Sequence, residues 1–415
     1  VLVRTLPTTG TIHNGGGLGI GPDGKLYWAV GDLSNGTGVS DDLTSLAAKI
    51  GRANRDGTLP SDNPFADGAG PNNDYIWARG YTSPFSMVFQ PGTGALWMDV
   101  AGQSYEQIFI VPAGSHAGFN LYENNQPAGF LRPIIAYRTN SLEARSLTGA
   151  VRSGGIATFT TTVEHGFHQG TKLTISNVAD PSFNGAGFIS SVPTPSTFTF
   201  AQAGANASSG SGTALMEQIG GAVTGGDFWS SSAVPAAYRG NFFFGDFNTH
   251  RIERVTLRAD NSVATFDHFA TGINQSVDVA AGPDGALYSL TLGGTIRRIS
   301  YNAPAQGLVV SPLHVRLDEG GRGVVNVRLA TAPLGNVVVG ASLAGDADIT
   351  LANGGALTFT SANWSTPQAL RVQAASDGDA SEDQATLTLS SSGLTSESVG
   401  VKVTELAGTA SGPAK

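Results

Sequence analysis

The sequence predicts an all-β protein built on a β-propeller, with two further β-modules. Glycine supplies 56 of the 415 residues and charged residues only 13%, a composition that suits short strands and tight turns better than helices. The string Gly-Pro-Asp-Gly-Lys-Leu-Tyr at 21–27 returns as Gly-Pro-Asp-Gly-Ala-Leu-Tyr at 282–288. A repeated turn-and-strand unit with short strands between the copies is typical of a propeller, whose blades have about 40 to 45 residues.

The propeller occupies two separate stretches of the chain. A looser copy of the repeated string stands at 91–97, and residues 238–246 contain a further strand of the same kind. An Asp-Gly turn before an alternating apolar strand predicts a β-hairpin. We therefore predict about four blades, in residues 1–140 and 218–303.

Residues 141–217 differ from the blades on either side and predict an inserted small β-domain. Threonine-rich strands replace the aromatic-rich pattern, and a stretch of Ala, Ser and Gly follows at 201–213. His165 and His168 lie in this segment beside Glu164, and no third histidine stands nearby to complete a metal site. A loop or packing role is therefore preferred for these histidines.

Residues 304–406 predict a C-terminal β-sandwich, and residues 407–415 a tail. About seven short strands fit into roughly 100 residues here, a density typical of sandwich folds. The last residues are small and polar, as in tails and linkers.

The composition excludes several classes of function. Without cysteine, the chain has no disulfide, no thiolate metal site and no cysteine nucleophile. The net charge is −9 and Lys and Arg form no cluster, so we expect no nucleic-acid partner. No apolar run reaches the ~18 to 20 residues of a membrane span. Few lysines among many Thr, Ser and Gly residues favour a secreted or cell-surface bacterial protein, whose export signal would precede Val1.

Three stretches of the chain resemble one family. They are the motif 13–18, which runs into the first repeat and ends at Asp32, the run from Lys49 to Gly80, and the run 277–288. They resemble the soluble glucose/sorbosone (aldose sugar) dehydrogenases, which are six-bladed propellers that use pyrroloquinoline quinone (PQQ). The resemblance covers 1–140 and 218–301 and implies a propeller of the six-bladed type.

The resemblance also implies that N-terminal blades are missing from this chain. Members of the family have about two blades before the histidine motif, whereas twelve residues precede His13 here. An open propeller exposes strand edges that proteins normally cover. We therefore expect residues upstream of Val1, or another chain, to complete the ring.

His13 matches the family's general base, which takes the proton from the sugar C1 hydroxyl while hydride moves to the quinone. Imidazole suits proton abstraction near neutral pH, and the surrounding glycines let a bulky cofactor approach closely. The alternative for His13 is a structural histidine that forms hydrogen bonds in a turn.

The cations that would anchor the quinone are absent from the matching positions. PQQ carries three carboxylates, which require cationic partners, above all arginine. Neutral residues stand at the family's cationic positions: Thr82, Gln275, Val277, and Asn248 or Thr249. Three residues close to these positions in sequence are the candidate cofactor-binding residues: Arg79, His116 and Arg251.

Calcium is the second cofactor that the resemblance implies. The matching loop is 99–107, where backbone oxygens of Gly102 and Gln103 are the candidate ligands and Gln107 replaces a family glutamate. Oxygen ligands of this kind suit Ca²⁺. The alternative is a plain loop between blades.

The two added modules carry resemblances of their own. The insert is similar to small β-domains of bacterial surface and phage-associated proteins, through His-Gly-Phe at 165–167 and Phe-Asn-Gly at 183–185. The C-terminal module resembles the Calx-β or immunoglobulin-like repeats of exported bacterial proteins, through 318–321 and 359–364. Its acidic residues Asp377, Asp379, Glu382 and Asp383 are either a calcium site or, as we prefer, a solvated loop.

Two functions remain open on the sequence. The missing cations favour a non-catalytic extracellular scaffold, adhesion or filament-forming protein, whose partners would be further copies of itself or extracellular glycans. The retained His13 and its glycines favour a PQQ-dependent aldose or alcohol dehydrogenase. One fold hosts many functions, so the fold does not decide between them.

Overall fold

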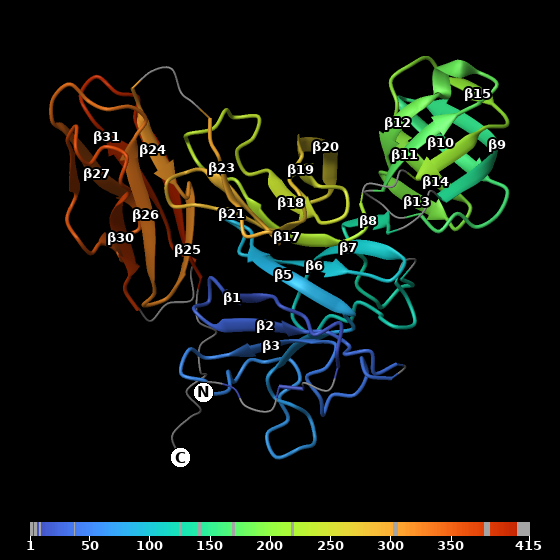
Figure 1. Ribbon diagram of the computed structural model, residues 1–415, viewed down its shortest axis with the longest axis horizontal. Helices are drawn as coiled ribbons and strands as arrows, with labels where there is room; N and C mark the ends of the chain where they lie inside the picture. Colours follow the sequence, from blue (N-terminus) through green and yellow to red (C-terminus); the bar gives the residue numbers. More distant parts are fainter. Residues whose placement is uncertain are drawn as a thin grey trace.

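The computed structural model describes residues 3, 6–7, 10–36, 38–123, 126–139, 143–167, 171–216, 220–301, 306–376 and 382–404. The described residues are nearly all strands and turns, with one short 3₁₀ helix at Pro181–Phe183. The predicted all-β fold is therefore confirmed. Within these residues no helix has the length and hydrophobicity needed to span a bilayer. Figure 1 shows the propeller in the middle, the insert at one end and the sandwich at the other.

The propeller contains four antiparallel sheets, as the repeats predict. The first strand of the third blade, β17, packs on the first strands of both neighbouring blades, β5 and β21. The first strand of each blade therefore lies nearest the propeller axis. The first blade has β1 (Leu18–Ile20), β2 (Leu26–Val30), β3 (Lys49–Ala53) and β4 (Ile76–Arg79), and the second has β5 (Ser83–Phe89), β6 (Leu96–Ala101), β7 (Tyr105–Ile110) and β8 (Ile135–Arg138). The third has β17 (Val223–Phe228), β18 (Phe242–Asp246), β19 (Arg251–Leu257) and β20 (Val263–Thr271), and the fourth has β21 (Ser276–Ala281), β22 (Leu287–Thr291) and β23 (Ile296–Ile299).

The aspartate of the repeated string ties each turn to the strands that follow. In the first blade, Asp23 accepts a hydrogen bond of 2.9 Å from the Tyr27 hydroxyl. Two guanidinium nitrogens of Arg52, on β3, donate to the same oxygen of Asp23 at 2.9 and 2.8 Å. The opposite charges and the burial of Arg52 hold this hairpin against the third strand.

The fourth blade repeats this arrangement. Asp284 accepts from the Tyr288 hydroxyl at 3.0 Å and from Nε of Arg298, on β23, at 2.7 Å. The similar strings at 21–27 and 282–288 thus share a physical cause, since each needs an acid in the turn and a tyrosine four residues later.

Each blade packs one face on the next blade in chain order. Aromatic and aliphatic side chains fill these layers, which bury the middle of the propeller. The layers contain Tyr27, Ala29, Met98 and Val100 between the first and second blades, Trp97, Tyr137, Phe228 and Phe242 between the second and third, and Phe243, Ile252, Val279 and Leu287 between the third and fourth.

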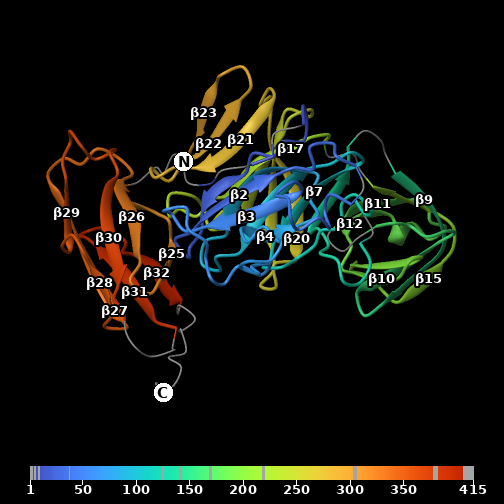
Figure 2. The ribbon, with the colours of Figure 1, turned by 90° about the horizontal axis from the view of Figure 1, so that it is seen from below.

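Part of a blade face remains exposed at each end of this arc, although loop residues such as Leu46 and Phe65 bury Trp28 and Val30 on the outer face of the first blade. On the first blade, Leu18 and Ile20 of β1 are exposed. On the fourth blade, Leu290 and Ile296 pair across β22 and β23, and both are exposed together with Leu292. The propeller is therefore an open arc, with the fourth blade standing clear of the first (Figure 2).

The insert lies between the second and third blades in the chain. Its sheet runs in the order β12-β11-β16-β9-β10-β14-β13, with β15 on β9, and it curls around a core that includes Phe159, Phe183 and Phe198. Its strands are β9 (Glu143–Ser153), β10 (Ile156–Thr161), β11 (Lys172–Ser176), β12 (Gly185–Phe188), β13 (Ser191–Thr194), β14 (Thr197–Ala201), β15 (Ala207–Ser209) and β16 (Thr213–Met216).

The C-terminal part is a sandwich of two sheets around one apolar core. One sheet runs in the order β24-β26-β30-β28 and the other in the order β25-β32-β31-β27-β29. The strands are β24 (Leu308–Ser311), β25 (His314–Asp318), β26 (Arg322–Leu329), β27 (Val337–Gly345), β28 (Ile349–Leu351), β29 (Ala356–Phe359), β30 (Gln368–Ala374), β31 (Gln384–Ser390) and β32 (Glu397–Thr404).

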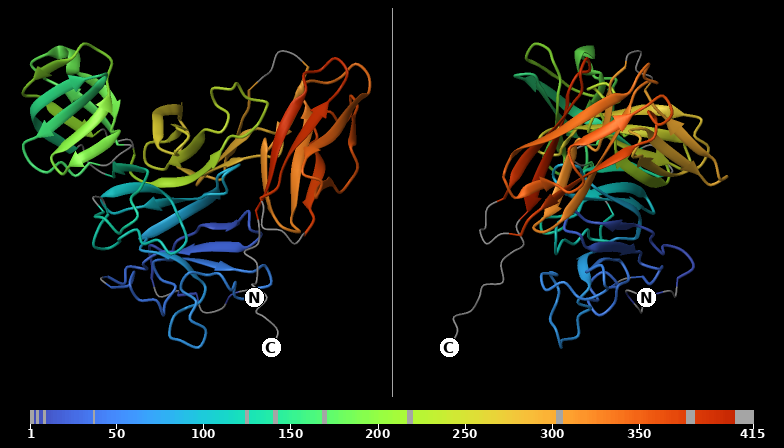
Figure 3. Two further views of the ribbon diagram at one scale, coloured as in Figure 1. Left: turned by 180° about the vertical axis from the view of Figure 1, so that it is seen from behind. Right: turned by 90° about the vertical axis from the view of Figure 1, so that its left-hand side faces the viewer.

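The sandwich docks on one end of the propeller (Figure 3). It meets the connections between the first and second strands of the blades: Arg316 lies beside Gly94, Val310 N donates to Ser232 Oγ at 2.9 Å, and Arg328 Nε donates to the carbonyl of Asp284. These connections lie where the innermost strands end. His13 and Thr82 lie at the opposite end, where the innermost strands β1 and β5 begin.

Candidate functional site

His13 lies in a buried hydrogen-bonded group just before the first innermost strand. Its Nδ1 is 2.8 Å from Oδ1 of Asp32, and the same oxygen accepts a hydrogen bond of 3.1 Å from the Thr82 hydroxyl. Thr82 Oγ1 is also 3.5 Å from His13 Nδ1. Asp32 and Thr82 are buried, while His13 is partly exposed. The structure thus places the candidate base beside the position where the family has an arginine.

The backbone holds this group in place. Asp32 N donates to the Thr82 carbonyl at 2.7 Å, and Leu33 N donates to the His13 carbonyl at 3.3 Å. Gly31 lies between these carbonyls, and a Cβ there would collide with both oxygens. Glycine is therefore required at position 31, in the Gly-Asp pair that ends the first motif.

The charge beside His13 is negative. Its hydrogen bonds within the described residues are with a carboxylate and a hydroxyl, and neither group carries positive charge. An aspartate that accepts from Nδ1 orients the imidazole and leaves Nε2 to act on another molecule. The arrangement can accept a proton at Nε2, and no arginine or lysine of the described residues is hydrogen-bonded to it.

Arg79 and His116 both contact the Asp41 carboxylate. Arg79 Nη1 donates to Asp41 Oδ1 at 2.7 Å, and His116 Nε2 is 3.2 Å from the same oxygen. Burial lowers the pKa of His116, the nearby Arg79 lowers it further, and Asp41 acts in the opposite direction. Lys49 lies close by, and burial lowers its pKa to about 8. These cations are engaged by carboxylate and carbonyl oxygens of the chain itself.

Arg251 contacts a histidine of its own blade. It lies on the third strand of its blade, and its Nη1 contacts His268 Nε2 on the fourth strand at 3.2 Å. His268 in turn binds the buried carboxylate of Glu253 at 2.7 Å. The expectation that Arg251 could replace a missing anchor beside His13 gains no support from these contacts.

Asn248, Thr249 and Gln275, which stand at other positions where the family has cations, form hydrogen bonds within turns. The backbone nitrogens of Asn248 and Thr249 donate to the buried Asp246, and Gln275 N donates to His250 Nδ1. These residues cap turns of the third and fourth blades.

The loop at Gly102 and Gln103 binds a carboxylate of the chain. Glu123 Oε1 accepts from the backbone nitrogens of Gln103 and Ser104, and the Gln103 carbonyl accepts from the Thr139 hydroxyl at 3.2 Å. Calcium binding at Gly102 and Gln103 stays a prediction. Sequence reasoning missed Glu123, which lies 20 residues further along the chain.

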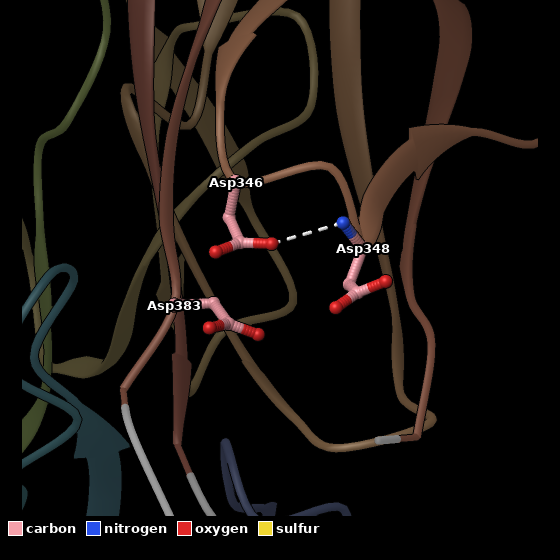
Figure 4. A group of neighbouring side chains, drawn as sticks. All are labelled: Asp346, Asp348 and Asp383. Carbon is pink, nitrogen blue, oxygen red and sulfur yellow. Dashed lines mark hydrogen bonds between the residues drawn. The ribbon is translucent and has the colours of Figure 1, made fainter. Parts of the chain in front are cut away.

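A second group that could hold a cation lies in the sandwich (Figure 4). One carboxylate oxygen from each of Asp346, Asp348 and Asp383 lies within 4.8 Å of the others, and Asp348 N donates to Asp346 Oδ1 at 3.0 Å. The sequence indicated Asp383 but not the other two, although the spacing Asp-x-Asp is visible in it. Asp377 and Asp379 lie outside the described residues.

His165 has a packing role. Its ring is buried, its Nδ1 accepts from Phe167 N at 2.9 Å, and it stacks on the Phe167 ring at 5.2 Å. Burial lowers its pKa. This agrees with the preferred interpretation, and His168 lies outside the described residues.

Comparison with known proteins shows what the first part of the propeller resembles. Residues 1–135 match the Glucose / Sorbosone dehydrogenase family. This segment contains the first blade, most of the second blade and the His13 group, and two of the three motifs lie within it.

Individual relatives match only part of the chain. The Aldose sugar dehydrogenase YliI of Escherichia coli (strain K12) is 32% identical over 120 residues, 28% of this chain and 32% of that protein. Quinoprotein glucose dehydrogenase B of Acinetobacter calcoaceticus is 26% identical over 125 residues, 26% of each chain. The chain thus matches about a third or less of these relatives' length.

Among solved structures, the soluble aldose sugar dehydrogenase of Escherichia coli in its apo-form has a TM-score of 0.46 and 19% identity, over 70% of this chain and 64% of that one. A structure described as glucose dehydrogenase has a TM-score of 0.48 and 17% identity, over 73% of this chain and 68% of that one.

The residues around His13 do not fit PQQ. A quinone with three carboxylates requires cationic partners, whereas the groups bonded to His13 and to each other here are the Asp32 carboxylate and the Thr82 hydroxyl. No arginine of the described residues is hydrogen-bonded to this group.

Proposed function

We propose that this chain is a non-catalytic, extracellular bacterial scaffold protein derived from a sugar-dehydrogenase propeller. The observation that carries this proposal is the hydrogen bond from Thr82 to Asp32, beside His13. An arginine at that position would supply a charge-assisted hydrogen bond of about 1.5 to 3 kcal/mol to an anionic cofactor. The only side-chain donor of Thr82, its hydroxyl, is bonded to the carboxylate that holds His13.

A dehydrogenase is the second candidate, and the pairing of His13 with Asp32 favours it. A histidine oriented by a buried carboxylate is a suitable general base. As a scaffold, the same pair holds the segment before β1 against the end of β2, so its presence is consistent with both functions.

Titration with PQQ and calcium, followed by calorimetry and by dye-coupled aldose oxidation, separates the two functions. The proposal expects no saturable binding at micromolar PQQ and no turnover. Micromolar binding with turnover that disappears in His13→Ala would establish the dehydrogenase and overturn the proposal.

We further propose that copies of the chain assemble head to tail through the exposed blade faces. Within the arc, the second face of each blade packs on the first face of the next. The exposed faces are the first face of the first blade, with Leu18 and Ile20, and the second face of the fourth, with Leu290 and Ile296. On the first blade only the β1 part of this face is free, because loop residues such as Leu46 and Phe65 cover Trp28 and Val30. The proposed contact joins these exposed apolar residues of two copies, and such heterologous contacts form closed rings or filaments.

Sedimentation velocity over a range of concentrations tests this assembly. We expect the unmodified chain to associate, and Leu18→Glu or Ile296→Glu to be monomeric alone. A mixture of the two variants should stop at a dimer, because each keeps one intact face. Leu334→Glu, on an exposed sandwich loop, is the matched control. A chain that stays monomeric at every concentration would contradict the assembly and indicate that another segment covers these faces.

We also propose identities for the two added modules and a location for the protein. The insert and the sandwich are assigned to the surface-protein and Calx-β or immunoglobulin-like repeats on their motifs. Few lysines among many Thr, Ser and Gly residues support an exported protein. Nucleic acid is not expected as a partner, because the net charge is −9.

A further inference from the structure

A crevice of about 590 Å³ lies where the fourth blade meets the sandwich. It is distinct from the His13 group, since it lies at the end of the propeller where the innermost strands finish. The blades supply Asp284, Arg298 and Tyr301 to its lining, and the sandwich supplies Arg328 and Trp364. Sites between domains often bind ligands, because two rigid elements can position groups from both sides.

Positive charge exceeds negative charge in this crevice. Arg298 is paired with Asp284 at 2.7 Å. Arg328 exposes only 9% of its surface. Its Nε and Nη1 donate to the carbonyls of Asp284 and Leu329, at 2.6 and 3.0 Å, and in the described parts of the chain no carboxylate forms an ion pair with it. Two arginines and one aspartate leave one uncompensated positive charge in a partly buried place, which attracts an anion.

The remaining lining suits a sugar. Trp364 is half-buried and Tyr301 is exposed, so both offer ring surface to the crevice, and hydroxyls of Ser300, Thr331 and Ser365 line it as well. Aromatic rings pack on the C–H faces of a sugar ring, while hydroxyls and guanidinium groups bond its polar edges. A carboxylate is the anion that arginine binds with two parallel hydrogen bonds.

We propose that this crevice binds a carboxylate-bearing saccharide, such as a uronic acid unit of an acidic glycan. The carboxylate faces Arg298 and Arg328, and the sugar ring packs on Trp364 and Tyr301. The proposal goes beyond the scaffold function and does not depend on whether His13 is catalytic or whether the chain assembles.

Calorimetric titration of the full chain with a trimer of galacturonic acid tests the proposal. We expect at least tenfold tighter binding of this trimer than of the neutral galactose trimer, and tighter binding than of citrate. Arg298→Gln should weaken binding at least tenfold, and Tyr301→Ala several-fold. Arg297→Gln is the matched control: Arg297 precedes Arg298 on the same strand, and its Nη1 donates to the Gly272 carbonyl instead.

Three other results would overturn the proposal. Equal binding of the neutral trimer would show that charge plays no part, and equal binding of citrate would reduce the crevice to a general anion site. Absence of binding would mean that Arg328 serves only to join the sandwich to the fourth blade. Arg298 and Tyr301 are exposed enough for their variants to fold, and their unfolding temperatures, compared with that of Arg297→Gln, check this.

Discussion

Thr82 donates a hydrogen bond of 3.1 Å to Oδ1 of Asp32, the same oxygen that lies 2.8 Å from Nδ1 of His13. The residue that replaces the family's arginine is therefore joined to the candidate base through a shared carboxylate. A neutral partner stabilises Asp32 without competing with His13 for its charge.

We expect Thr82→Val to lower the free energy of unfolding by about 1 kcal/mol, because it removes one donor from a buried carboxylate. His13→Ala should cost about 1.5 to 3 kcal/mol, since the lost bond involves a charged group. Urea denaturation measures both. Thr93→Val, at an exposed turn, is the control. Stability unchanged in His13→Ala would contradict a structural role for this histidine.

Restoring cations should restore an affinity for PQQ. We expect Thr82→Arg combined with Gln275→Arg and Val277→Arg to bind PQQ at least a hundredfold more tightly than the unmodified chain, as each charged hydrogen bond contributes about tenfold or more. Fluorescence titration with Ca²⁺ present measures this. If the triple variant gains no affinity, the matched positions do not converge on one site.

Stability should fall as the pH rises from about 4.5 to 8, because of Glu106. Burial, and secondarily the nearby Asp246, raises the pKa of Glu106 from 4.5 to about 8 in the folded protein. Over this interval the folded state keeps a proton that the unfolded state releases, so deprotonation favours unfolding. Glu106→Gln keeps an acceptor for the Val223 backbone nitrogen, which bonds Glu106 at 2.9 Å. This variant should be more stable than the unmodified chain at pH 8, by about 2 kcal/mol or more.

Thermal unfolding between pH 5 and pH 9 measures that difference. Glu164→Gln, at an exposed position, should leave the pH profile unchanged. A Glu106→Gln profile that parallels the unmodified one would place the titration elsewhere.

Arg52→Gln should destabilise the first blade. Its guanidinium is buried and bonds Asp23 at 2.8 Å and Asp62 at 2.8 Å, so the variant leaves two carboxylates without their cation. We expect a loss of about 3 kcal/mol, as for other broken buried pairs. Arg55→Gln, three residues on and exposed, should change stability by about 0.5 kcal/mol or less. Equal losses of stability in Arg52→Gln and Arg55→Gln, measured by denaturant titration, would show that the ion pair between Arg52 and Asp23 does not stabilise the blade.

The insert should be removable. The first residue of β9 pairs with the last of β16, Glu143 opposite Met216, so the two ends of the insert are neighbours. Replacement of residues 143–216 by a short Gly-Ser linker should leave the propeller and sandwich folded, with a modest loss because Phe188 packs on the layer between the second and third blades. Circular dichroism and thermal unfolding check this. Failure to fold would show that the insert is part of the propeller core.

The sequence by itself determined the all-β fold, the repeat and the blade count, because these follow from local chemistry. An Asp-Gly turn followed by alternating apolar residues forms a hairpin whatever surrounds it, and the repeated acid and tyrosine act within a few residues of each other. His13 could be indicated as well, because it stands in the short motif that resembles the sugar-dehydrogenase family.

Only the tertiary structure decided which residues meet. Asp32 and Thr82 join His13 from 19 and 69 residues away, Asp41 contacts Arg79 and His116 from 38 and 75 residues away, and Arg251 contacts His268. Docking of the sandwich likewise brought Arg328 to Asp284 across 44 residues. Such pairings depend on how blades stack and modules dock, and that geometry is set by packing over the whole chain rather than by any short stretch of it.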